Sequence, residues 1–348
     1  MEVKQRKLFV LTDVEPDDFI SIIFIIEHFI KNNISFDNLF ITTSLMNPHK
    51  KTKIIEKLLE SYGIFRHDCW LNSGFSGLKE EYKSYGIFQH DCWLNSGFSG
   101  LKEEYKEEGV GILSNNEINE IKEFEGTDVI EIFDYYCNKK CMKGDIIDCL
   151  ILANPFKFRE IIGKHYDIIG DIYMMGGYFI KNCSYNWSIN MDSTNDFFKW
   201  INEYNKKCVV YSSDMFAKVY NGYFNYGKFP EVMKTIFDSN KKSIKYFIQA
   251  IKNWDSYVTD NGKDEEMVKR IGKDNIGKQF CVSDLVCTIG YLFRDQVEKQ
   301  VKYIKFCFNK TFILFEDDYG YKECYNCLKI ENIDINFINK ILIEYIKQ

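Results

Sequence analysis

The sequence predicts an α/β fold with a mostly parallel, open, twisted sheet and helices on both faces. Short apolar runs alternate along the chain with longer segments whose apolar residues repeat at helical spacing. Alternation of strands and helices is typical of parallel sheets, whose strands are buried on both faces and therefore form continuous apolar runs. With 348 residues, the chain is long enough for a substantial core. We expect one domain over residues 1–348.

The elements follow one another in regular order. The first strand is expected at residues 8–11 and the first helix at 19–30, with Pro16 in the turn between them. Further strands are expected at 38–43, 146–153, 168–175 and 208–212, and further helices at 50–60, 129–139, 156–163 and 193–205. Residues 227–294 form a mainly helical C-terminal region. Short strands at 303–315 and 327–330 and a helix at 335–346 then complete the chain.

An internal repeat interrupts this pattern. Residues 61–83 recur as residues 84–106, and the copies differ only where Arg66 becomes Gln89. Repeat architectures need at least about three units to bury a continuous core, so the pair indicates a tandem duplication inserted within the domain. Each copy resembles a short strand that leaves through a glycine-containing loop. We expect the first copy to lie in the sheet, because it directly follows the helix at 50–60.

Composition argues against several classes of partner. The net charge is -6, and Lys and Arg are interspersed with acids, so we expect no nucleic-acid partner. The longest apolar stretch, residues 19–26, is too short to cross a bilayer, and the N-terminus has no secretory pattern, so we expect no membrane association and a cytoplasmic location. The 12 cysteines are dispersed, which favours reduced, mostly buried thiols over disulfides. Zinc sites at Cys137 and Cys141 or at Cys324 and Cys327 have only loose spacing in their favour.

Four carboxylates gather within six residues at the end of the first strand: Asp13, Glu15, Asp17 and Asp18. The carboxyl ends of strands are where α/β folds place ligands. Such crowding is costly unless a cation or a helix N-terminus balances the charge. Two interpretations remain open here. Ordinary helix capping explains Asp17 or Asp18 but not Asp13, whereas a hard-cation site explains all three.

Further candidates follow at other strand and helix ends. Asp284 lies in an otherwise apolar run and needs a partner, which is a salt bridge, a helix cap or the site that holds Asp13. Ala153 ends a buried strand and is followed by Asn154, so its carbonyl could face the same crevice. Met175 ends the next strand before two glycines, which either form a tight turn or let a ligand approach the backbone.

In their order and spacing, these motifs resemble the nucleoside hydrolase family, the inosine- and uridine-preferring ribohydrolases. The resemblance covers nearly the full chain apart from the extra repeat copy. Asp13, Asp17 and Asp18 match the last three acids of the family's opening DxDPGxDD motif. Other segments are similar to its Thr-Asn turn, its Met-Gly-Gly strand end, its E(W/F)NxxxDPEA segment, its His-Asp-Pro helix start and its terminal Val-Asp-x-x-x-Phe pattern, at 153–154, 175–177, 186–192, 283–285 and 333–337 respectively.

The resemblance implies a nucleoside hydrolase-like fold and calcium-dependent hydrolysis of the N-glycosidic bond of a ribonucleoside or related ribosyl compound. Calcium (Ca²⁺) would be held by Asp13, Asp18, Asp284 and the carbonyl of Ala153. Asp13 would also take the proton of the attacking water. The small-molecule substrate would contact Asp17, through a ribose hydroxyl, and Asn47, Met175, Asn186, Ser188 and Ser283. A homo-oligomer is compatible with the sequence.

The departures from the family pattern fall mostly on substrate contacts. Leu11 replaces the first acid of the opening motif, Asn186 and Ser188 stand where the family has Glu and Asn, and Ser283 stands where many members have His. The alternative is therefore a catalytically weakened nucleoside- or ribose-binding or scaffold protein that keeps the fold and metal site. A phosphatase-like hydrolase with an Asp nucleophile is disfavoured, because Leu11 removes the first acid of an Asp-x-Asp pair.

The leaving group needs a proton donor or must itself be a stable anion. The sequence offers few candidates for the donor, namely Trp254, Tyr257 and the repeat histidines His67 and His90.

Overall fold

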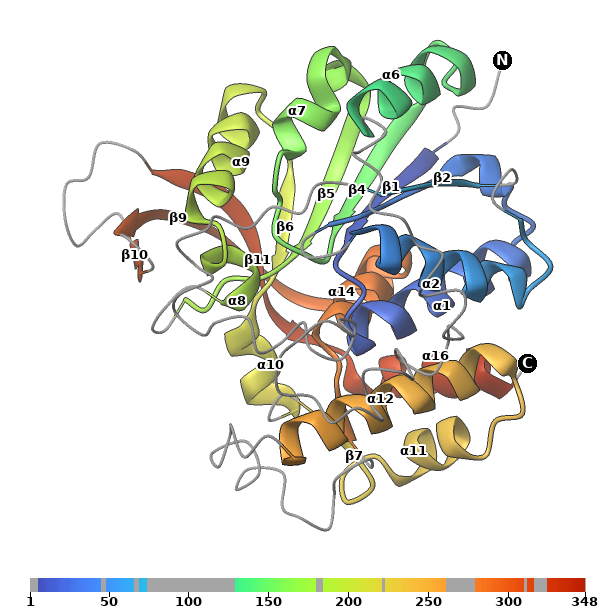
Figure 1. The fold of residues 1–348 in the computed structure, drawn as a ribbon. Coiled ribbons are helices and arrows are strands. Elements are labelled where there is room, and N and C mark those ends of the chain that lie inside the picture. The colour runs from blue at the N-terminus through green and yellow to red at the C-terminus, as the bar shows by residue number, and fades with distance from the viewer. Residues whose placement is uncertain are drawn as a thin grey trace.

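Nine strands form one sheet in the computed structural model, which describes residues 6–44, 48–65, 69–73, 129–179, 184–220, 223–260, 279–309, 312–315 and 324–347 (Figure 1). The strand order is β10-β9-β11-β6-β5-β4-β1-β2-β3. The strands are β1 (Arg6–Thr12), β2 (Leu39–Thr43), β3 (Trp70–Ser73), β4 (Ile146–Ile151), β5 (Ile169–Met175), β6 (Cys208–Tyr211), β9 (Glu298–Asn309), β10 (Phe312–Phe315) and β11 (Tyr325–Ile333). Neighbours from β3 to β11 pair in parallel, whereas β9 and β10 are added antiparallel.

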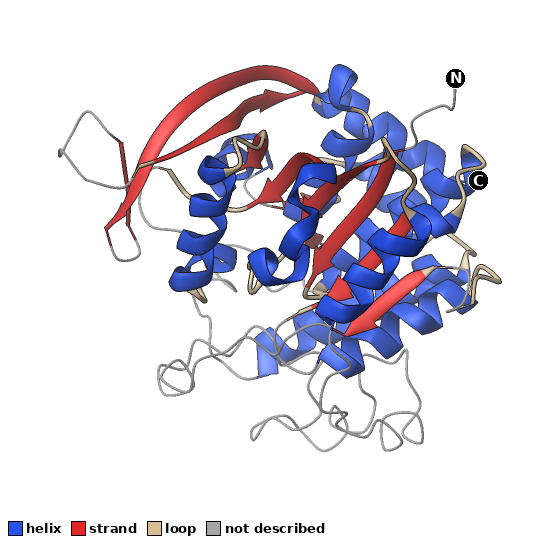
Figure 2. Cartoon of the chain, turned by 90° about the horizontal axis from the view of Figure 1, so that it is seen from above, coloured by secondary structure: helices blue, strands red, loops and turns tan. Residues whose placement is uncertain are grey.

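Helices cover both faces of this sheet (Figure 2). They are α1 (Pro16–Lys31), α2 (Pro48–Glu60), α6 (Val129–Lys140), α7 (Phe158–Ile162), α8 (Tyr185–Ser188), α9 (Met191–Glu203), α10 (Ser213–Tyr220), α11 (Pro230–Phe237), α12 (Lys242–Asp260), α14 (Ser283–Leu292), α15 (Arg294–Val297) and α16 (Ile335–Lys347). Two 3-10 turns lie at Phe36–Asn38 and Gly163–Ile168. A small antiparallel pair, β7 (Tyr223–Asn225) and β8 (Gln279–Cys281), lies apart from the main sheet.

The central strand β1 shows why the sheet is covered on both sides. Its side chains alternate between two hydrophobic clusters, with Leu8 and Val10 in one and Phe9 and Leu11 in the other. Alternation is the geometric property of a strand, and here both alternating sets are apolar. In the first cluster, these strand side chains pack with side chains of α1, α2, α12, α14 and α16. In the second, they pack with side chains of α6, α7 and α9. Each face of β1 is therefore a core.

The chain reverses its direction of growth across the sheet at β1. After β1 it adds β2 and then β3 on one side, and it returns to add β4, β5 and β6 on the other. In doubly wound sheets, ligands bind outside the carboxyl ends of the strands at this reversal point. The carboxyl ends of β1 and β4 adjoin there, as the hydrogen bond from Leu152 N to Leu11 O (2.8 Å) shows.

The predicted fold class is confirmed, with two differences in detail. The helical region expected at 227–294 is interrupted by β8, since Phe280 pairs with Phe224 of β7 before α14 begins. The C-terminal strands belong to the main sheet, because β11 pairs in parallel with β6.

The first repeat copy supplies β3, which pairs with β2 through register partners that include Phe40 with Trp70. The second copy, residues 84–106, lies outside the described residues.

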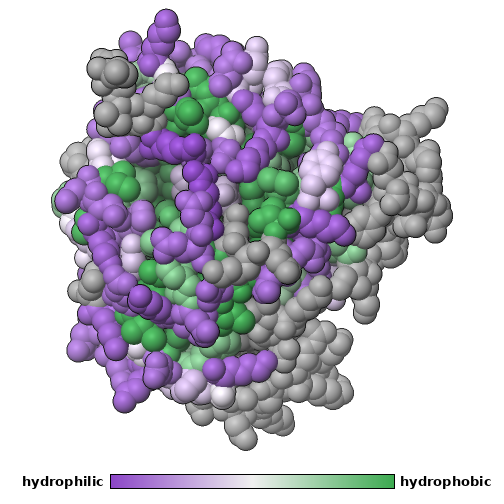
Figure 3. All heavy atoms as spheres, turned by 180° about the vertical axis from the view of Figure 1, so that it is seen from behind, coloured by the Kyte–Doolittle hydropathy of each residue, from purple (hydrophilic) through white to green (hydrophobic). Residues whose placement is uncertain are grey.

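Cysteines whose side chains the structure describes are free thiols; Cys141 and Cys324 are half-buried, and the others are buried, namely Cys69, Cys137, Cys149, Cys208, Cys287, Cys307 and Cys327. Among the described residues, no helix combines the length and apolar character that a bilayer span requires. Figure 3 shows the face opposite to that of Figure 1, where hydrophilic residues predominate and hydrophobic ones form smaller groups between them.

Gly290 provides a test of how closely α14 packs on the sheet. A Cβ at this position would overlap the hydroxyl and ring of Tyr211 on β6. We expect Gly290→Ala to lower the free energy of unfolding by about 1–3 kcal/mol, the usual cost of overpacking, as measured by urea denaturation. The control, Lys340→Ala at an exposed position of α16, should change it by less than about 0.5 kcal/mol. Equal stability of the two variants would contradict the close contact.

Candidate metal centre

The candidate site lies in the turn that joins β1 to α1. Val14 in this turn adopts φ +56°, a left-handed conformation that is unfavourable for a β-branched residue. A backbone conformation of this kind costs on the order of 1–3 kcal/mol of folding free energy, and it persists only where the surrounding structure fixes it. The Thr12 hydroxyl provides part of this constraint, because it accepts a hydrogen bond from Val14 N (3.0 Å) and donates one to Asp18 Oδ1 (2.6 Å).

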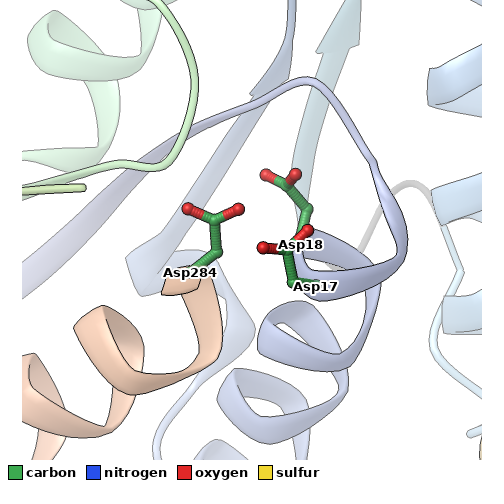
Figure 4. Close-up of side chains that lie close together, drawn as sticks. All are labelled: Asp17, Asp18 and Asp284. Carbon is green, nitrogen blue, oxygen red and sulfur yellow. The ribbon is translucent and has the colours of Figure 1, made fainter. Parts of the chain in front are cut away.

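Three carboxylates converge on this turn from two helices (Figure 4). Asp17 and Asp18 lie in the first turn of α1, and Asp284 lies in the first turn of α14. Each contributes one carboxylate oxygen to a group of atoms that all lie within 4.8 Å of one another. All three residues are buried, with exposures of 7%, 0% and 4% respectively. Residues that are 266 positions apart in the sequence therefore share one site, because α14 packs against α1.

Asp13 adjoins this group from the end of β1. It is buried, and its carboxylate forms a hydrogen bond with the Asp18 side chain. Burial raises the pKa of Asp18 well above its usual range, and the negative charges of Asp13 and Asp17 raise it further. The hydrogen bond to Asp13 acts in the same direction, whereas the one from Thr12 opposes it. The neighbouring carboxyl groups therefore disfavour the charged form of Asp18, and a bound cation would favour it.

For Asp18, the structure is compatible with both interpretations of the acidic turn, helix capping and a hard-cation site. Its Oδ2 accepts a hydrogen bond from Glu15 N (3.1 Å), so Asp18 is the third-position member of a capping box at the start of α1. The same carboxylate belongs to the group with Asp17 and Asp284. Capping does not account for Asp284, which belongs to a different helix. Among the described residues, this is the single group of three or more side chains of the metal-ligating types.

A second set of predicted residues lies at the adjoining ends of β4 and β5. Asn186 Nδ2 donates to Leu152 O (2.6 Å) and approaches Met175 Sδ (3.4 Å). Asn154 Nδ2 in turn donates to Asn186 O (2.6 Å). Ala153 is fully buried between Leu152 and Asn154, next to the end of β1. The predicted substrate residues Met175 and Asn186 are thus brought together.

Ser188 and Ser283 lie on different elements. Ser188 is half-buried at the end of α8, two residues beyond Asn186, and Ser283 is buried beside Asp284. Asn47 lies outside the described residues, as does His67 with its repeat counterpart His90. Their assignments stay predictions.

The glycine pair after β5 accommodates a side chain of the protein itself. Gly176 and Gly177 have φ +151° and +77°, and a Cβ on either would overlap the indole of Trp187. Trp187 is fully buried between Asn186 and Ser188. The glycines therefore let an aromatic ring pack under the strand end, which the sequence motif alone does not reveal.

Thr12 and Lys51 are residues of the site that the sequence reasoning did not single out. Thr12 fixes the Asp18 carboxylate, and Lys51 is a fully buried lysine of α2 whose Nζ donates to Ser44 O (3.3 Å) beside the end of β1. The strand-end position of Thr12 could have drawn attention to it. Lys51 carries no comparable signal, because three more lysines share the same helix.

The raised pKa of Asp18 leads to a prediction about pH. A carboxyl whose pKa is higher in the folded than in the unfolded chain contributes stability below the unfolded pKa, about 3.9, and loses it as the pH rises through the folded pKa. Asp18→Asn removes this loss and still accepts from the Thr12 hydroxyl. In cation-free buffer, we expect the Tm of the variant minus that of the wild type to increase from pH 4 to pH 8 by about 2 °C or more.

Asp192→Asn is the matched control, because Asp192 is an exposed acid in the first turn of α9. Its Tm difference should show little dependence on pH. A difference for Asp18→Asn that falls with pH would contradict the electrostatic account.

No protein-family model matches the sequence, and a search of curated proteins finds no match. Solved structures do match over almost the whole length. A plant nucleoside hydrolase has a TM-score of 0.62 at 15% identity, with 98% of each chain covered. The inosine-uridine preferring nucleoside hydrolase from Bacillus anthracis has a TM-score of 0.59 at 9% identity, with 99% of each chain covered.

A third similar structure is the type III effector protein XopQ complexed with adenosine diphosphate ribose. It has a TM-score of 0.64 at 9% identity, and the alignment covers 99% of this chain and 93% of the effector. At such low identities the likeness concerns the fold, and it agrees with the resemblance found in the sequence motifs. The chain has the fold of the nucleoside hydrolases.

Proposed function

We propose that this protein hydrolyses the N-glycosidic bond of a ribonucleoside or a related ribosyl compound and requires calcium to do so. The observation that carries the proposal is the group of buried carboxylates of Asp17, Asp18 and Asp284, with ligand oxygens within 4.8 Å. The group lies at the reversal point of a doubly wound sheet, where such folds bind ligands. The nucleoside hydrolase fold of the chain supports the same conclusion.

The residues present fit a hard divalent cation. The side-chain ligands would all be carboxylate oxygens, which calcium prefers. Calcium binds 6–8 oxygen atoms in total, and backbone carbonyls and waters can supply the remainder. Asp18 and Asp284 would be ligands, with Asp13 and the Ala153 carbonyl completing the protein's share. The structure adds Asp17 to the candidate ligands. A bound cation would orient ribose hydroxyls and lower the pKa of water in the site.

The positions of the side chains support the roles that the family resemblance implies for them. Asp13 would accept the proton of the attacking water, because it lies at the strand end next to Asp18 and is itself buried. Asp17, at the outer edge of the group with 7% exposure, would accept a hydrogen bond from a ribose hydroxyl. The negative charge of the cluster would favour the positive charge that develops on the sugar in an oxocarbenium-like transition state.

Apart from Asp17, the described residues that we propose as substrate contacts are uncharged. Asn186, Ser188 and Ser283 carry no charge, and they would contact the sugar or the leaving group through amide and hydroxyl groups. The adenosine diphosphate ribose bound to the effector of similar fold widens the candidates from nucleosides to larger ribosyl compounds.

One observation favours the alternative of a ligand-binding or scaffold protein with weakened turnover. The Asn186 amide nitrogen is engaged by Leu152 O and Met175 Sδ, so this group supports the local backbone as well as facing the site.

The test is a panel of ribonucleosides and adenosine diphosphate ribose assayed for release of the free ribosyl product, with calcium and with a chelator. We expect release from at least one compound, its loss on chelation, and a decrease of about 10²–10⁴-fold in Asp13→Ala. Glu203→Gln, at an exposed position of the C-terminal end of α9 and so away from the carboxyl ends of the strands, should retain wild-type activity. Activity that persists unchanged in both chelator and Asp13→Ala would contradict the proposal. Ligand binding without product release would instead establish the binding-protein alternative.

A further inference from the structure

A buried ion pair lies where β6 and β11 adjoin α10. Lys329 of β11 is the register partner of Val210 on β6, and its Nζ is 2.7 Å from Asp214 Oδ2 in the first turn of α10. The side chains of Lys329 and Asp214 are only 8% and 1% exposed. Desolvation offsets most of the attraction within such a pair, so apolar residues can often replace it without loss of stability. The pair therefore calls for a role other than stability.

The second carboxylate oxygen of Asp214 holds the segment that follows β5. Asp214 Oδ1 accepts a hydrogen bond from Phe179 N (3.2 Å). The preceding residue, Ser213, donates its N–H to Gly177 O (2.8 Å). Gly177 N in turn donates to Ser184 Oγ (2.7 Å), just before α8. The start of α10 thus fixes two backbone groups of the segment after β5, and the same segment is tied to the start of α8.

This segment supports two of the residues that we propose as substrate contacts. The Phe179 ring packs edge to face on the indole of Trp187, with 5.8 Å between the ring centroids. Trp187 is fully buried and lies on α8 between Asn186 and Ser188. We call Asn186 and Ser188 the neutral wall. A shift of Phe179 would displace Trp187 and, with it, the short helix that carries the neutral wall.

Lys329 fixes the direction in which the Asp214 carboxylate points. Its Nζ donates to Asp214 Oδ2 and to Glu331 Oε1 (2.9 Å), and it lies 5.2 Å from the centre of the Phe179 ring, within cation–π range. Burial lowers the pKa of Lys329, but the hydrogen bonds to the two carboxylates outweigh burial and raise it above its ordinary value. The lysine is therefore charged and engages one oxygen of Asp214, which leaves the other for Phe179 N.

We propose that Lys329 and Asp214 are positioning residues of the ligand site, which hold the neutral wall in the geometry that receives the ribosyl ligand. The ion pair acts on the wall through the backbone after β5 and the ring of Phe179. The inference rests on the proposed function and adds a division of roles. The acidic cluster binds the cation, whereas the ion pair controls the affinity for the organic part of the ligand.

Lys329→Met tests this role, because it leaves the Asp214 carboxylate buried without its ammonium partner. For the panel compound that is hydrolysed fastest, we expect KM to increase about 10- to 100-fold, the size of effect that follows from a displacement of about 1 Å. The value of kcat should change much less, because the wall contacts substrate and transition state alike. The Kd for Ca²⁺, measured by calorimetric titration, should stay within about twofold of the wild type.

Lys7→Met is the matched control for the loss of a buried lysine. Lys7 Nζ is 3.6 Å from Asp145, but Lys7 lies near the amino end of β1, about 16 Å along the strand from its carboxyl end. We expect this variant to have a lower Tm than the wild type and an unchanged KM. A general loss of stability would instead affect both variants alike.

Two double variants isolate the hydrogen bond to Phe179. Lys329→Met with Asp214→Asn removes both charges and keeps an oxygen that accepts from Phe179 N, so it should recover most of the lost affinity. Lys329→Met with Asp214→Ala removes the acceptor as well and should not recover it. This pair of variants decides the question if Lys329→Met alone does not fold, because neither double variant contains a buried unpaired charge at these two positions.

Hydrogen exchange provides a measurement that does not require turnover. The Phe179 amide donates to a buried carboxylate, so it should be protected in the wild type and exchange faster in Lys329→Met, whereas the amides of α1 and α14 should keep their protection. Unchanged KM and unchanged exchange in Lys329→Met would overturn the inference. Equal losses of ligand and calcium affinity in Lys329→Met and Lys7→Met would also overturn it. If the wild type releases no product from any compound, the proposed function fails, and exchange at Phe179 still decides the role of the ion pair.

Discussion

The arrangement of the site depends on one electrostatic constraint, the crowding of four buried carboxyl groups around the end of β1. Asp13, Asp17 and Asp18 are adjacent because the chain passes from strand to helix within a few residues. Asp284 joins them because α14 is buried against α1 and the sheet. The N-termini of both helices face the cluster, and their partial positive charges offset part of the repulsion. The left-handed Val14 and the Thr12 hydroxyl then fix the geometry in which the carboxylates meet.

The two sides of the site differ in charge. The side formed by β1, α1 and α14 carries the carboxylates, whereas the ends of β4 and β5 carry the amide of Asn186 and the thioether of Met175. A ligand with a polyhydroxylated sugar matches this division, since its hydroxyls can approach the anionic side together with a cation. The rest of the ligand would lie toward the neutral side. Under the proposed function, the departures at Asn186, Ser188 and Ser283 would fall on ligand contacts, whereas Asp13, Asp18 and Asp284 would hold the cation.

Most of the architecture could be predicted from the sequence, because apolar runs and helical periodicity report burial directly. The strand expected at residues 8–11 is β1, and the acidic turn lies where its carboxyl end was expected. The pairing of Asp284 with Asp17 and Asp18 could not be derived from periodicity, since it depends on helix packing across the chain. The motif resemblance supplied it instead. The burial of Lys51 could not be predicted at all, because α2 presents several lysines and only the packed structure shows which one points inward.

The position of β3 at the border of the sheet is relevant to the tandem duplication of residues 61–83. Among the described strands it is the last on its side of the sheet, and it pairs with β2 alone. The first copy of the duplicated segment begins just before this strand and continues beyond it. A segment copied at that point displaces no strand between two neighbours and leaves every register from β2 to β11 intact. The border of a sheet is thus where added sequence disturbs folding least, and natural selection could have retained the duplication there without any benefit from it.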